Sequence, residues 1–595
     1  MHRRWFINRT NPEYIAYISK TASVSPALAQ ILINRGIKTP GEINTFLNPH
    51  ISQLSDPFDI QGMGIAVDRI MAASKSGERI LVHGDYDVDG LSATAIVLKA
   101  LKMLGIDSHY FIPNRIEHGY GFNPSSVKKA KQAGATLIIT VDCGITSSET
   151  VALCKKEGID VIITDHHEPP RSQRSEVRSQ TEDSELTTDN YLLPDALAVI
   201  NPKISNHKSS ISNLSGAGVA FKLAQALEQT GGKGSRGQVK DPRTLESPDP
   251  SLLLLDLAAL GTMADAVPLT GENRFIVKEG VKLIKDGTRP GLNALKRVSG
   301  IEERILKPGL LLFTIIPRIN AAGRVSDSTN VVKLLLTDSE DEANEISLWL
   351  DKHNSERQKI EGEVYQEAIC KLNSKGIGPA IVLASEGWHL GVIGIVASRI
   401  AETFYRPTFV ISIEGQVAKG SARSIPSFDI YKALTGCREF LTGFGGHKQA
   451  AGLELKVDDI LSFEKCINRI ADETLTEKDL ISSIEIDADV DFSDINFNLT
   501  TEIGMLEPFG SGNPEPLLGS KRLEVLYPKI VGNNHLRMKL RQKNQSLDAI
   551  GFDMAVFFDS LENSTTVDAV FTPFVNEWEG VRGLQLNLKA FRPSL

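Results

Sequence analysis

Short apolar runs that alternate with helix-forming segments are the feature that most limits how this chain can fold. From about residue 61, the runs Ile80–His83, Leu137–Val141 and Val161–Thr164 are separated by helical stretches such as Leu91–Leu104 and Ser147–Glu157. This alternation is typical of parallel strands connected by helices. The sequence therefore predicts an α/β domain with a parallel sheet. Each run ends in polar residues, and ligands of such sheets bind beyond the carboxyl ends of the strands.

Composition excludes several classes of protein. The chain has 595 residues with 41% hydrophobic residues, which is enough for several cores, and no stretch approaches the roughly 20 apolar residues of a membrane span. Five cysteines form no CxxC pair, so we expect a reducing, cytoplasmic location rather than a disulfide framework or a zinc ribbon. The net charge is −9. A nucleic-acid partner would therefore need a local basic groove.

The pattern along the chain predicts five parts. They are a helical cap (1–60), the first α/β domain (61–337), a connecting helix (338–372), a second α/β domain (373–475) and a β-rich tail (476–595). The tail alternates strand-like runs with turns, which favours an OB-like barrel and also fits a sandwich. The long helix fits both a surface helix and a spacer. Two segments poor in aliphatic residues, 171–190 and 230–250, are interpreted as surface loops, with a docking site as the alternative.

A run of acidic residues follows the first strand, in the segment His83-Gly84-Asp85-Tyr86-Asp87-Val88-Asp89-Gly90. It matches the start of a calcium-binding EF-hand loop, which needs a glutamate at its twelfth position. Here that position is Ile96, and the segment follows a strand, so the EF-hand interpretation fails. A solvated acidic turn is the simplest alternative for such a match taken alone.

The acidic run is not isolated. The next strand ends at Asp142, the one after at Asp165-His166-His167, and a later apolar segment ends at Asp265. Carboxylates and imidazoles at one sheet edge would repel one another or stay unsatisfied unless cations were bound. This mixed set suits Mn²⁺, with Mg²⁺ as the alternative, and is large enough for two ions about 3.5–4 Å apart.

These segments resemble the DHH phosphoesterase superfamily, and the resemblance to its RecJ family of bacterial single-strand-specific exonucleases covers nearly the whole chain. The matching segments outside the acidic run include Ile112-Pro113-Asn114-Arg115, Pro317-Arg318-Ile319-Asn320-Ala321-Ala322-Gly323-Arg324, Gly387-Trp388-His389, Gly420-Ser421-Ala422-Arg423, Gly445-Gly446-His447 and Pro508-Phe509-Gly510. The fold it implies is a DHH catalytic domain, a connecting helix, a DHH-associated domain and an OB-like domain that binds nucleic acid.

The resemblance also implies roles for the acidic and histidine residues. One metal would be held by His83, Asp87 and Asp142, and the other by Asp89, Asp142, His166 and Asp265. His167 would face the scissile phosphate as a charge stabiliser or proton donor. Asp85 would support the site from behind the ligands. The family does not always keep histidine at the position of His83.

Strand polarity would come from residues outside the metal site. The resemblance implies that Arg115, Ser421 and Arg423 bind a 5′-phosphate, for which guanidinium groups and hydroxyls are suited. Further candidates for nucleic-acid contact are Arg318, Asn320, Arg324, Trp388, His389, Gly446, His447 and Phe509. Core packing is the alternative for Trp388.

The activity implied is removal of 5′-mononucleotides from single-stranded DNA, from 5′ to 3′, in DNA repair and recombination. The expected partners are single-stranded DNA, single-strand-binding protein and a helicase, with no membrane, and the expected state is a monomer. Two alternatives remain open. One is a phosphodiesterase of short oligonucleotides or small nucleotides, and the other is a non-catalytic single-strand-binding replication factor, which should have lost the ligands found here.

Overall fold

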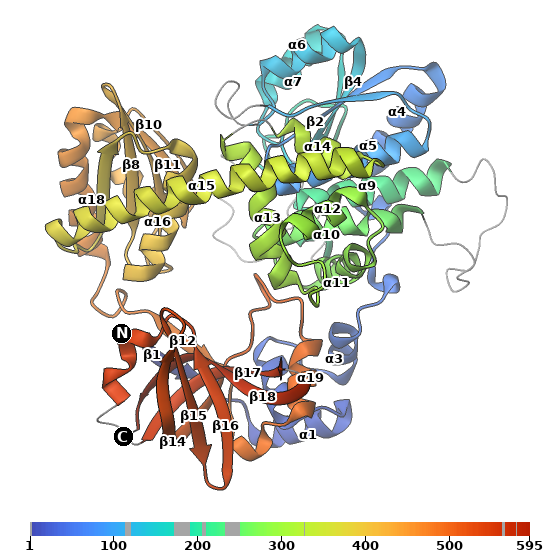
Figure 1. Cartoon of the computed structure of the whole chain (residues 1–595). Coiled ribbons are helices and arrows are strands. Elements are labelled where there is room, and N and C mark those ends of the chain that lie inside the picture. The colour runs from blue at the N-terminus through green and yellow to red at the C-terminus, as the bar shows by residue number, and fades with distance from the viewer. Residues whose placement is uncertain are drawn as a thin grey trace. The chain divides into compact units, whose positions relative to one another are not determined.

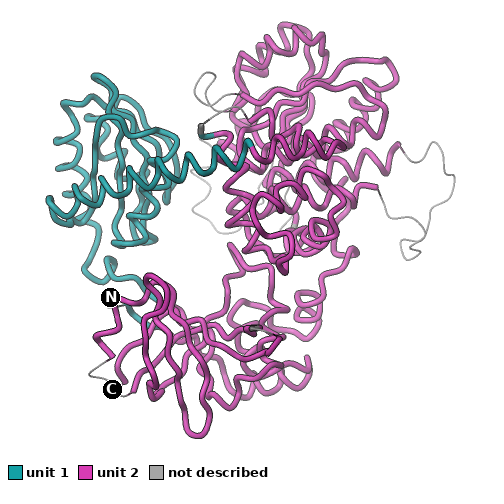
Figure 2. Tube along the Cα trace, viewed as in Figure 1, with its two compact units in different colours: residues 1–6, 324–326, 349–484 teal, residues 7–323, 327–348, 485–595 magenta. Residues whose placement is uncertain are grey.

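The computed structural model describes residues 3–113, 121–171, 191–204, 210–231, 250–325, 328–561, 566–578 and 580–594 (Figure 1). Two compact units divide the chain (Figure 2). One contains residues 1–6, 324–326 and 349–484, and the other contains residues 7–323, 327–348 and 485–595.

A five-stranded parallel sheet forms the centre of the larger unit, in the order β3-β2-β4-β5-β6. Its strands are β2 (Arg79–Gly84), β3 (Ser108–Phe111), β4 (Ala135–Val141), β5 (Asp160–Thr164) and β6 (Ala198–Ile200). The register pairs Gly84 with Val141 and Val141 with Thr164, so the carboxyl ends of β2, β4 and β5 are level. The residues that follow them therefore start at one edge.

Helices accompany this sheet and continue after it. They are α4 (Met63–Ser76), α5 (Val88–Met103), α6 (Pro124–Ala133), α7 (Ser148–Lys156), α9 (Gly216–Gly231), α10 (Leu255–Ala264), α11 (Gly271–Asp286), α12 (Pro290–Val298), α13 (Pro308–Val325) and α14 (Thr329–Leu336). Helix α5 is buried along nearly its whole length and contacts both α9 and α10. Because α5, α9 and α10 pack together, their ends can meet beside the sheet edge.

Ion pairs of Arg69 connect helix α4 to the parallel sheet. Arg69 on α4 bonds Glu78 (Nη2 to Oε2, 2.7 Å) and Asp160 (Nε to Oδ2, 2.7 Å). Glu78 also accepts hydrogen bonds from Thr136 and Ser76. Together these interactions, with Arg69 as the main contributor, lower the pKa of Glu78 from 4.5 to about 2.

Replacing Glu78 by glutamine should lower the free energy of unfolding at pH 7 by about 1–2 kcal/mol, since hydrogen bonds to a charged group are lost from a partly exposed site. A carboxylate whose folded pKa is depressed stabilises the fold above its unfolded pKa and loses that effect as pH falls through the folded pKa. The difference from the wild type should therefore be full above pH 4.5 and disappear near pH 2. Thermal unfolding from pH 7 to pH 3, with the exposed Glu402→Gln as control, checks this; a pH-independent difference would contradict it.

The smaller unit contains a second sheet, in the order β10-β11-β9-β8-β7, with β7 and β8 parallel and the other pairs antiparallel. Its elements are β7 (Ile381–Glu386), α16 (Leu390–Phe404), β8 (Thr408–Glu414), β9 (Val417–Arg423), α17 (Ile430–Gly436), β10 (Gly443–Gly446), β11 (Ala450–Lys456) and α18 (Ile460–Thr474). Helix α15 (Glu340–Lys375) precedes it as one continuous helix of 36 residues. The predicted second α/β domain and long helix are confirmed.

A closed β-barrel forms in the tail, because β14 pairs with both β15 and β17. Its elements are β13 (Ala488–Asp489), α19 (Phe497–Met505), β14 (Leu518–Val531), β15 (His535–Gln542), β16 (Gln545–Gly551), β17 (Thr566–Trp578) and β18 (Val581–Pro593). The barrel prediction is confirmed over the sandwich alternative. A separate two-stranded sheet pairs β1 (Arg4–Ile7) with β12 (Ser483–Ile486).

The first helices of the chain share their core with this barrel. Helices α1 (Pro12–Ala22), α2 (Pro26–Asn34) and α3 (Pro40–Leu47) contribute residues such as Leu28 and Leu32 to one hydrophobic cluster with Phe492 and Phe571. A buried Arg274 on α11 also donates hydrogen bonds to the carbonyls of Phe46, Met505 and Leu506. The sequence did not indicate this long-range packing.

Three expectations lie mostly or wholly outside the described residues. They concern the insertions 171–190 and 230–250, and Arg115. Among the residues that are described, no helix is both long enough and apolar enough to cross a bilayer.

Candidate metal centre

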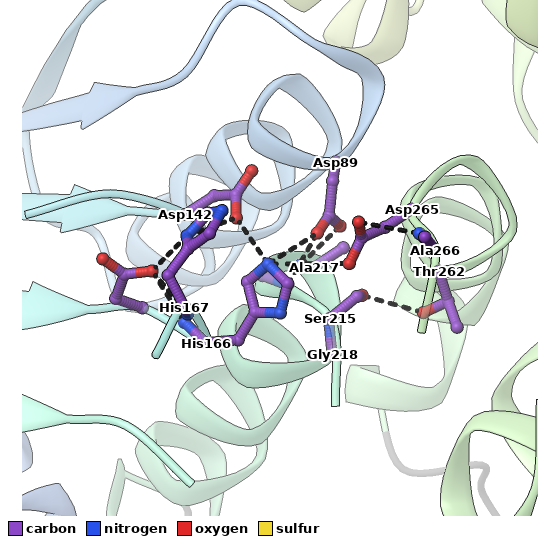
Figure 3. Close-up of polar contacts among 12 residues, drawn as sticks. Asp89, Asp142, His166, His167, Ser215, Ala217, Gly218, Thr262, Asp265 and Ala266 are labelled. Carbon is purple, nitrogen blue, oxygen red and sulfur yellow. Dashed lines mark hydrogen bonds and ion pairs between the residues drawn. The ribbon is translucent and has the colours of Figure 1, made fainter. Parts of the chain in front are cut away.

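The level strand ends bring the predicted acidic and histidine residues together (Figure 3). Asp85 follows β2, Asp142 follows β4, and His166 lies two residues beyond β5. The carboxylates meet around His166: its Nε2 lies 3.1 Å from Asp142 Oδ1, 3.5 Å from Asp265 Oδ2 and 3.8 Å from Asp89 Oδ2. Burial lowers the pKa of His166 to about 4, so its ring is neutral at pH 7, as a metal ligand must be.

Asp89 is held by the first turn of α9. Its Oδ2 accepts the N–H of Gly216 at 2.7 Å, and its Oδ1 accepts the N–H of Ala217 at 2.8 Å. These N–H groups have no partner within the helix, and the helix dipole favours negative charge there. The helix end therefore fixes both oxygens of a carboxylate that is only 2% exposed.

Asp142 lies in the left-handed backbone region, with φ +60°. Its own N–H is bonded to the carbonyl of Thr164 at 3.0 Å, and the conformation turns the carboxylate toward His166. Side chains in this region are strained, and such residues concentrate at functional sites. The side chain also has little room, because a Cβ on Gly216 would lie 2.6 Å from Asp142 Oδ1.

Asp165 holds His167, a role that sequence reasoning missed. Asp165 Oδ1 lies 2.8 Å from His167 Nδ1, and the carboxylate also accepts the N–H groups of Ile145, His166 and His167. Burial opposes a charge on His167, but the hydrogen bond and charge of Asp165 outweigh it and raise the pKa of His167 to about 9. The short spacing of the two residues, with only His166 between them, was the only available signal.

The remaining predicted residues of the centre lie beside Asp142. Asp85, Asp87 and Asp142 have ligand atoms within 4.8 Å of one another. Burial, followed by repulsion from Asp87, raises the pKa of Asp85 to about 7. His83 is fully buried with its Nδ1 3.1 Å from Ser126 Oγ, and burial lowers its pKa to about 3. His83 is absent from the three groups of closely spaced ligand atoms that the described residues form.

The donor set fits divalent cations. Burial and the neighbouring carboxylates raise the pKa of both Asp89 and Asp142 well above the usual range. Several buried atoms also have no hydrogen-bond partner among the described residues; they include His83 Nε2, Asp85 Oδ1, Asp142 Oδ1 and Asp265 Oδ2. Like charges and unsatisfied polar atoms in a buried cluster are costly unless a cation compensates them.

Ser421 and Arg423 lie together on β9, in the smaller unit. Arg423 Nη1 is 3.1 Å from Ser421 Oγ, and a Cβ on Gly394 of α16 would lie 3.0 Å from that hydroxyl. The first turns of α16 therefore pack closely against the pair. Arg115, their predicted companion, is outside the described residues.

Two nucleic-acid contact predictions meet contrary geometry. For Trp388 the structure favours the core-packing alternative: its ring is 3% exposed in an apolar cluster, and its Nε1 donates to Glu367 Oε2 at 2.9 Å. At the candidate contacts Gly446 and His447, one backbone donor is already used within the sheet, because the His447 N–H bonds the Ala450 carbonyl at 2.8 Å.

The other contact candidates lie on α13, at the start of α16 and beside the barrel core. Arg318 Nη1 donates to the Thr314 carbonyl at 2.7 Å, and Asn320 is half-buried on the same helix. His389 caps α16, and Arg324 Nη1 donates to the Gly391 carbonyl at 2.9 Å. Phe509 is partly buried against the barrel core.

Family models identify the class of protein that this fold and site define. Residues 79–262 match the DHH family, N-terminal domain, and residues 377–473 match the DHHA1 domain, as expected for a phosphoesterase of the DHH superfamily. Residues 486–590 match the RecJ OB domain. The chain belongs to the RecJ family.

Individual relatives agree with this assignment. The single-stranded-DNA-specific exonuclease RecJ of Bacillus subtilis is 36% identical over 98% of this chain and 70% of its own length. The enzyme of the same name from Salmonella typhimurium is 33% identical, over 95% of each chain. Crystal structures of RecJ from Thermus thermophilus with Mn²⁺ and with Mg²⁺ match with TM-scores of 0.82 and 0.75, at 29% and 28% identity. Both matches cover 100% of this chain, and 80% and 79% of those chains.

Proposed function

We propose that this chain is a metal-dependent exonuclease that acts on single-stranded DNA from the 5′ end and releases 5′-mononucleotides. The observation that carries the proposal is the cluster of three carboxylates, two of them buried, around the neutral ring of His166. Membership of the RecJ family, whose curated relatives are named single-stranded-DNA-specific exonucleases, supports the choice of substrate.

Two divalent cations, Mn²⁺ or Mg²⁺, are the proposed cofactors. Asp89, His166 and Asp265 would hold one, and Asp87 and Asp142 would hold the other, with Asp142 shared between them. Asp85 shares a group of closely spaced ligand atoms with Asp87 and Asp142, and His83 does not, so His83 has the least support among the proposed ligands. Bound there, the cations would lower the pKa of an attacking water and neutralise charge on the phosphate.

His167 is the proposed proton donor. Asp165 occupies its Nδ1, so the protonated ring keeps Nε2–H for the 3′-oxygen that leaves the phosphorus. The raised pKa keeps that proton on the ring at neutral pH, and the Asp165 hydrogen bond fixes the ring orientation. The side chain is 43% exposed, so the donor remains accessible to a substrate.

Recognition of the 5′ end is proposed to depend on Arg423, with Ser421 and Arg115. Replacing Arg423 by alanine should reduce the preference for 5′-phosphorylated over 5′-hydroxyl DNA by about 10-fold or more, since a charge-assisted hydrogen bond to phosphate is lost. Degradation rates of the two substrates measure this. Arg399→Ala, which removes a guanidinium from α16 of the same unit, is the matched control. An equal loss on both substrates would show that Arg423 does not read the phosphate.

We further propose that the enzyme acts in DNA repair and recombination, in the cytoplasm as a monomer, alongside single-strand-binding protein and a helicase. Arg318, Asn320, Arg324, His389, Gly446, His447 and Phe509 remain the proposed contacts along the strand. Membership of the RecJ family supports these contacts as a set.

The direct test uses single-stranded DNA labelled at either end, in Mn²⁺ and in EDTA. Stepwise release of mononucleotides from the 5′ end, abolished by EDTA, is the expected result. Hydrolysis of dinucleotides without cleavage of the longer strand would keep a phosphodiesterase and discard the exonuclease. Binding of the strand without any hydrolysis would favour a non-catalytic factor.

A further inference from the structure

Two buried hydroxyl groups, neither among the proposed ligands, connect the helices that position Asp89 and Asp265. Ser215 Oγ, immediately before α9, lies 3.0 Å from Thr262 Oγ1 on α10, and both residues are fully buried (Figure 3). Sequence reasoning assigned no role to either residue.

Ser215 organises the first turn of α9. Its Oγ accepts the N–H of Gly218 at 3.1 Å, which is the usual bond of a helix N-cap. The two preceding N–H groups, of Gly216 and Ala217, are then left for the two oxygens of Asp89. The Ser215 cap and the two N–H groups that bind the Asp89 carboxylate therefore belong to the same helical turn.

Thr262 lies one helical turn before Asp265, at the end of α10. Asp265 Oδ1 accepts the N–H of Ala266 at 2.8 Å, and Oδ2 lies 3.5 Å from His166 Nε2. Helices α9 and α10 touch directly here, because a Cβ on Gly261 would lie 2.5 Å from both Ala217 Cβ and Asp89 Oδ1. The hydroxyl pair of Ser215 and Thr262 lies at this contact and connects the two helix ends.

We propose that Ser215 and Thr262 are positioning residues that fix the separation of Asp89 and Asp265, and thereby the affinity of the cation held by these two residues and His166. The inference rests on the proposed function, since it requires that cations bind at this centre. Two like-charged carboxylates move apart unless the surrounding structure holds them, so an arrangement made before the cation arrives favours binding.

Mn²⁺ binding to the full-length protein tests this without measuring activity. Titration followed by the electron paramagnetic resonance signal of free Mn²⁺ should give two bound ions for the wild type. Ser215→Ala and Thr262→Val should each lower the affinity for one Mn²⁺ ion by about 10-fold, as found for residues that orient metal ligands. The affinity for the other ion should be unchanged. Thr262→Ser, which keeps the hydroxyl, should restore the affinity.

The double variant tests whether the hydroxyls act as a pair. If they do, the double variant Ser215→Ala/Thr262→Val should lower the affinity for this Mn²⁺ ion little more than either change alone. Each single change already breaks the hydrogen bond between the two hydroxyls. Ser520→Ala is the matched control: its buried Oγ donates to the Val490 carbonyl at 2.6 Å in the barrel, so it loses a comparable bond in a part of the chain that contributes none of the proposed ligands. It should lower the thermal midpoint and leave both Mn²⁺ affinities unchanged.

The outcomes separate the inference from the function on which it rests. Lower thermal midpoints with both Mn²⁺ affinities unchanged in Ser215→Ala and Thr262→Val would overturn the inference, leave the metal centre standing, and make the pair purely structural. A wild type that binds no Mn²⁺ would overturn the metal centre itself and the inference with it. If Ser215→Ala does not fold, Thr262→Val, which matches the shape of threonine, decides alone.

Discussion

Replacing Asp142 by asparagine should reduce nuclease activity by at least about 10³-fold, because Asp142 is the ligand proposed to be shared by both cations. Even residues that only orient metal ligands cost about 10–100-fold when changed, and a shared ligand should cost more. Asparagine also tolerates the left-handed backbone at this position, where φ is +60°. The change therefore removes the charge and keeps the local fold.

Asp142→Asn should be more stable than the wild type without metal and gain less stability than the wild type with metal. In EDTA it should unfold at a higher temperature than the wild type, because burial and the neighbouring carboxylates disfavour a charge at Asp142. With Mn²⁺ at about 100 times its dissociation constant, the wild type should gain about 2.7 kcal/mol and the variant much less.

Thermal unfolding with and without Mn²⁺ measures both effects. The exposed Asp472→Asn is the control, since it removes a carboxylate from α18 of the other unit. An Asp142→Asn protein that keeps its activity and its Mn²⁺-dependent stabilisation would contradict the assignment of Asp142 as a ligand.

Replacing Gly216 by alanine should reduce both stability and activity, although alanine is the better helix former. A glycine-to-alanine change in an open helix stabilises by about 1 kcal/mol. At Gly216 the new Cβ would lie 2.6 Å from both Cβ and Oδ1 of Asp142, so something must move. We expect a loss of about 1–3 kcal/mol, as for other overpacked sites. A displacement of about 1 Å at the reacting groups costs about 10²-fold in rate.

Gly362→Ala provides the matched control, since this residue lies within α15 with nothing within 4 Å of its would-be Cβ. It should raise stability, so the two substitutions have opposite signs. Chemical denaturation and the exonuclease rate measure the effects. Equal stabilisation by both changes, with full activity in Gly216→Ala, would show that Asp142 has more freedom than the structure indicates.

The parallel sheet and most acidic residues of the metal centre could be predicted from the sequence, because both are marked by local patterns in the chain. Strand ends such as Val141 and Thr164 are marked by apolar runs, and parallel strands necessarily place their carboxyl ends at one edge. The resemblance to RecJ added the order of domains. Trp388 shows where assigning roles from a matching segment reaches its limit. The segment matches the family, but the Trp388 ring is buried in the hydrophobic core.

By itself the sequence determined the parallel sheet, the long helix and the set of aspartates and histidines, since each depends on periodicity or adjacency in the chain. It left the tail as a barrel or a sandwich, and the pairing of β14 with both β15 and β17 decided for the barrel. Only the tertiary structure decided how the set is held. Asp89 meets the N–H groups of Gly216 and Ala217, which lie 127 and 128 residues further along the chain, and Ser215 meets Thr262. The first helices share a core with the barrel at the other end of the chain. Such contacts depend on how helices pack after the chain has folded, which no local pattern of residue types records.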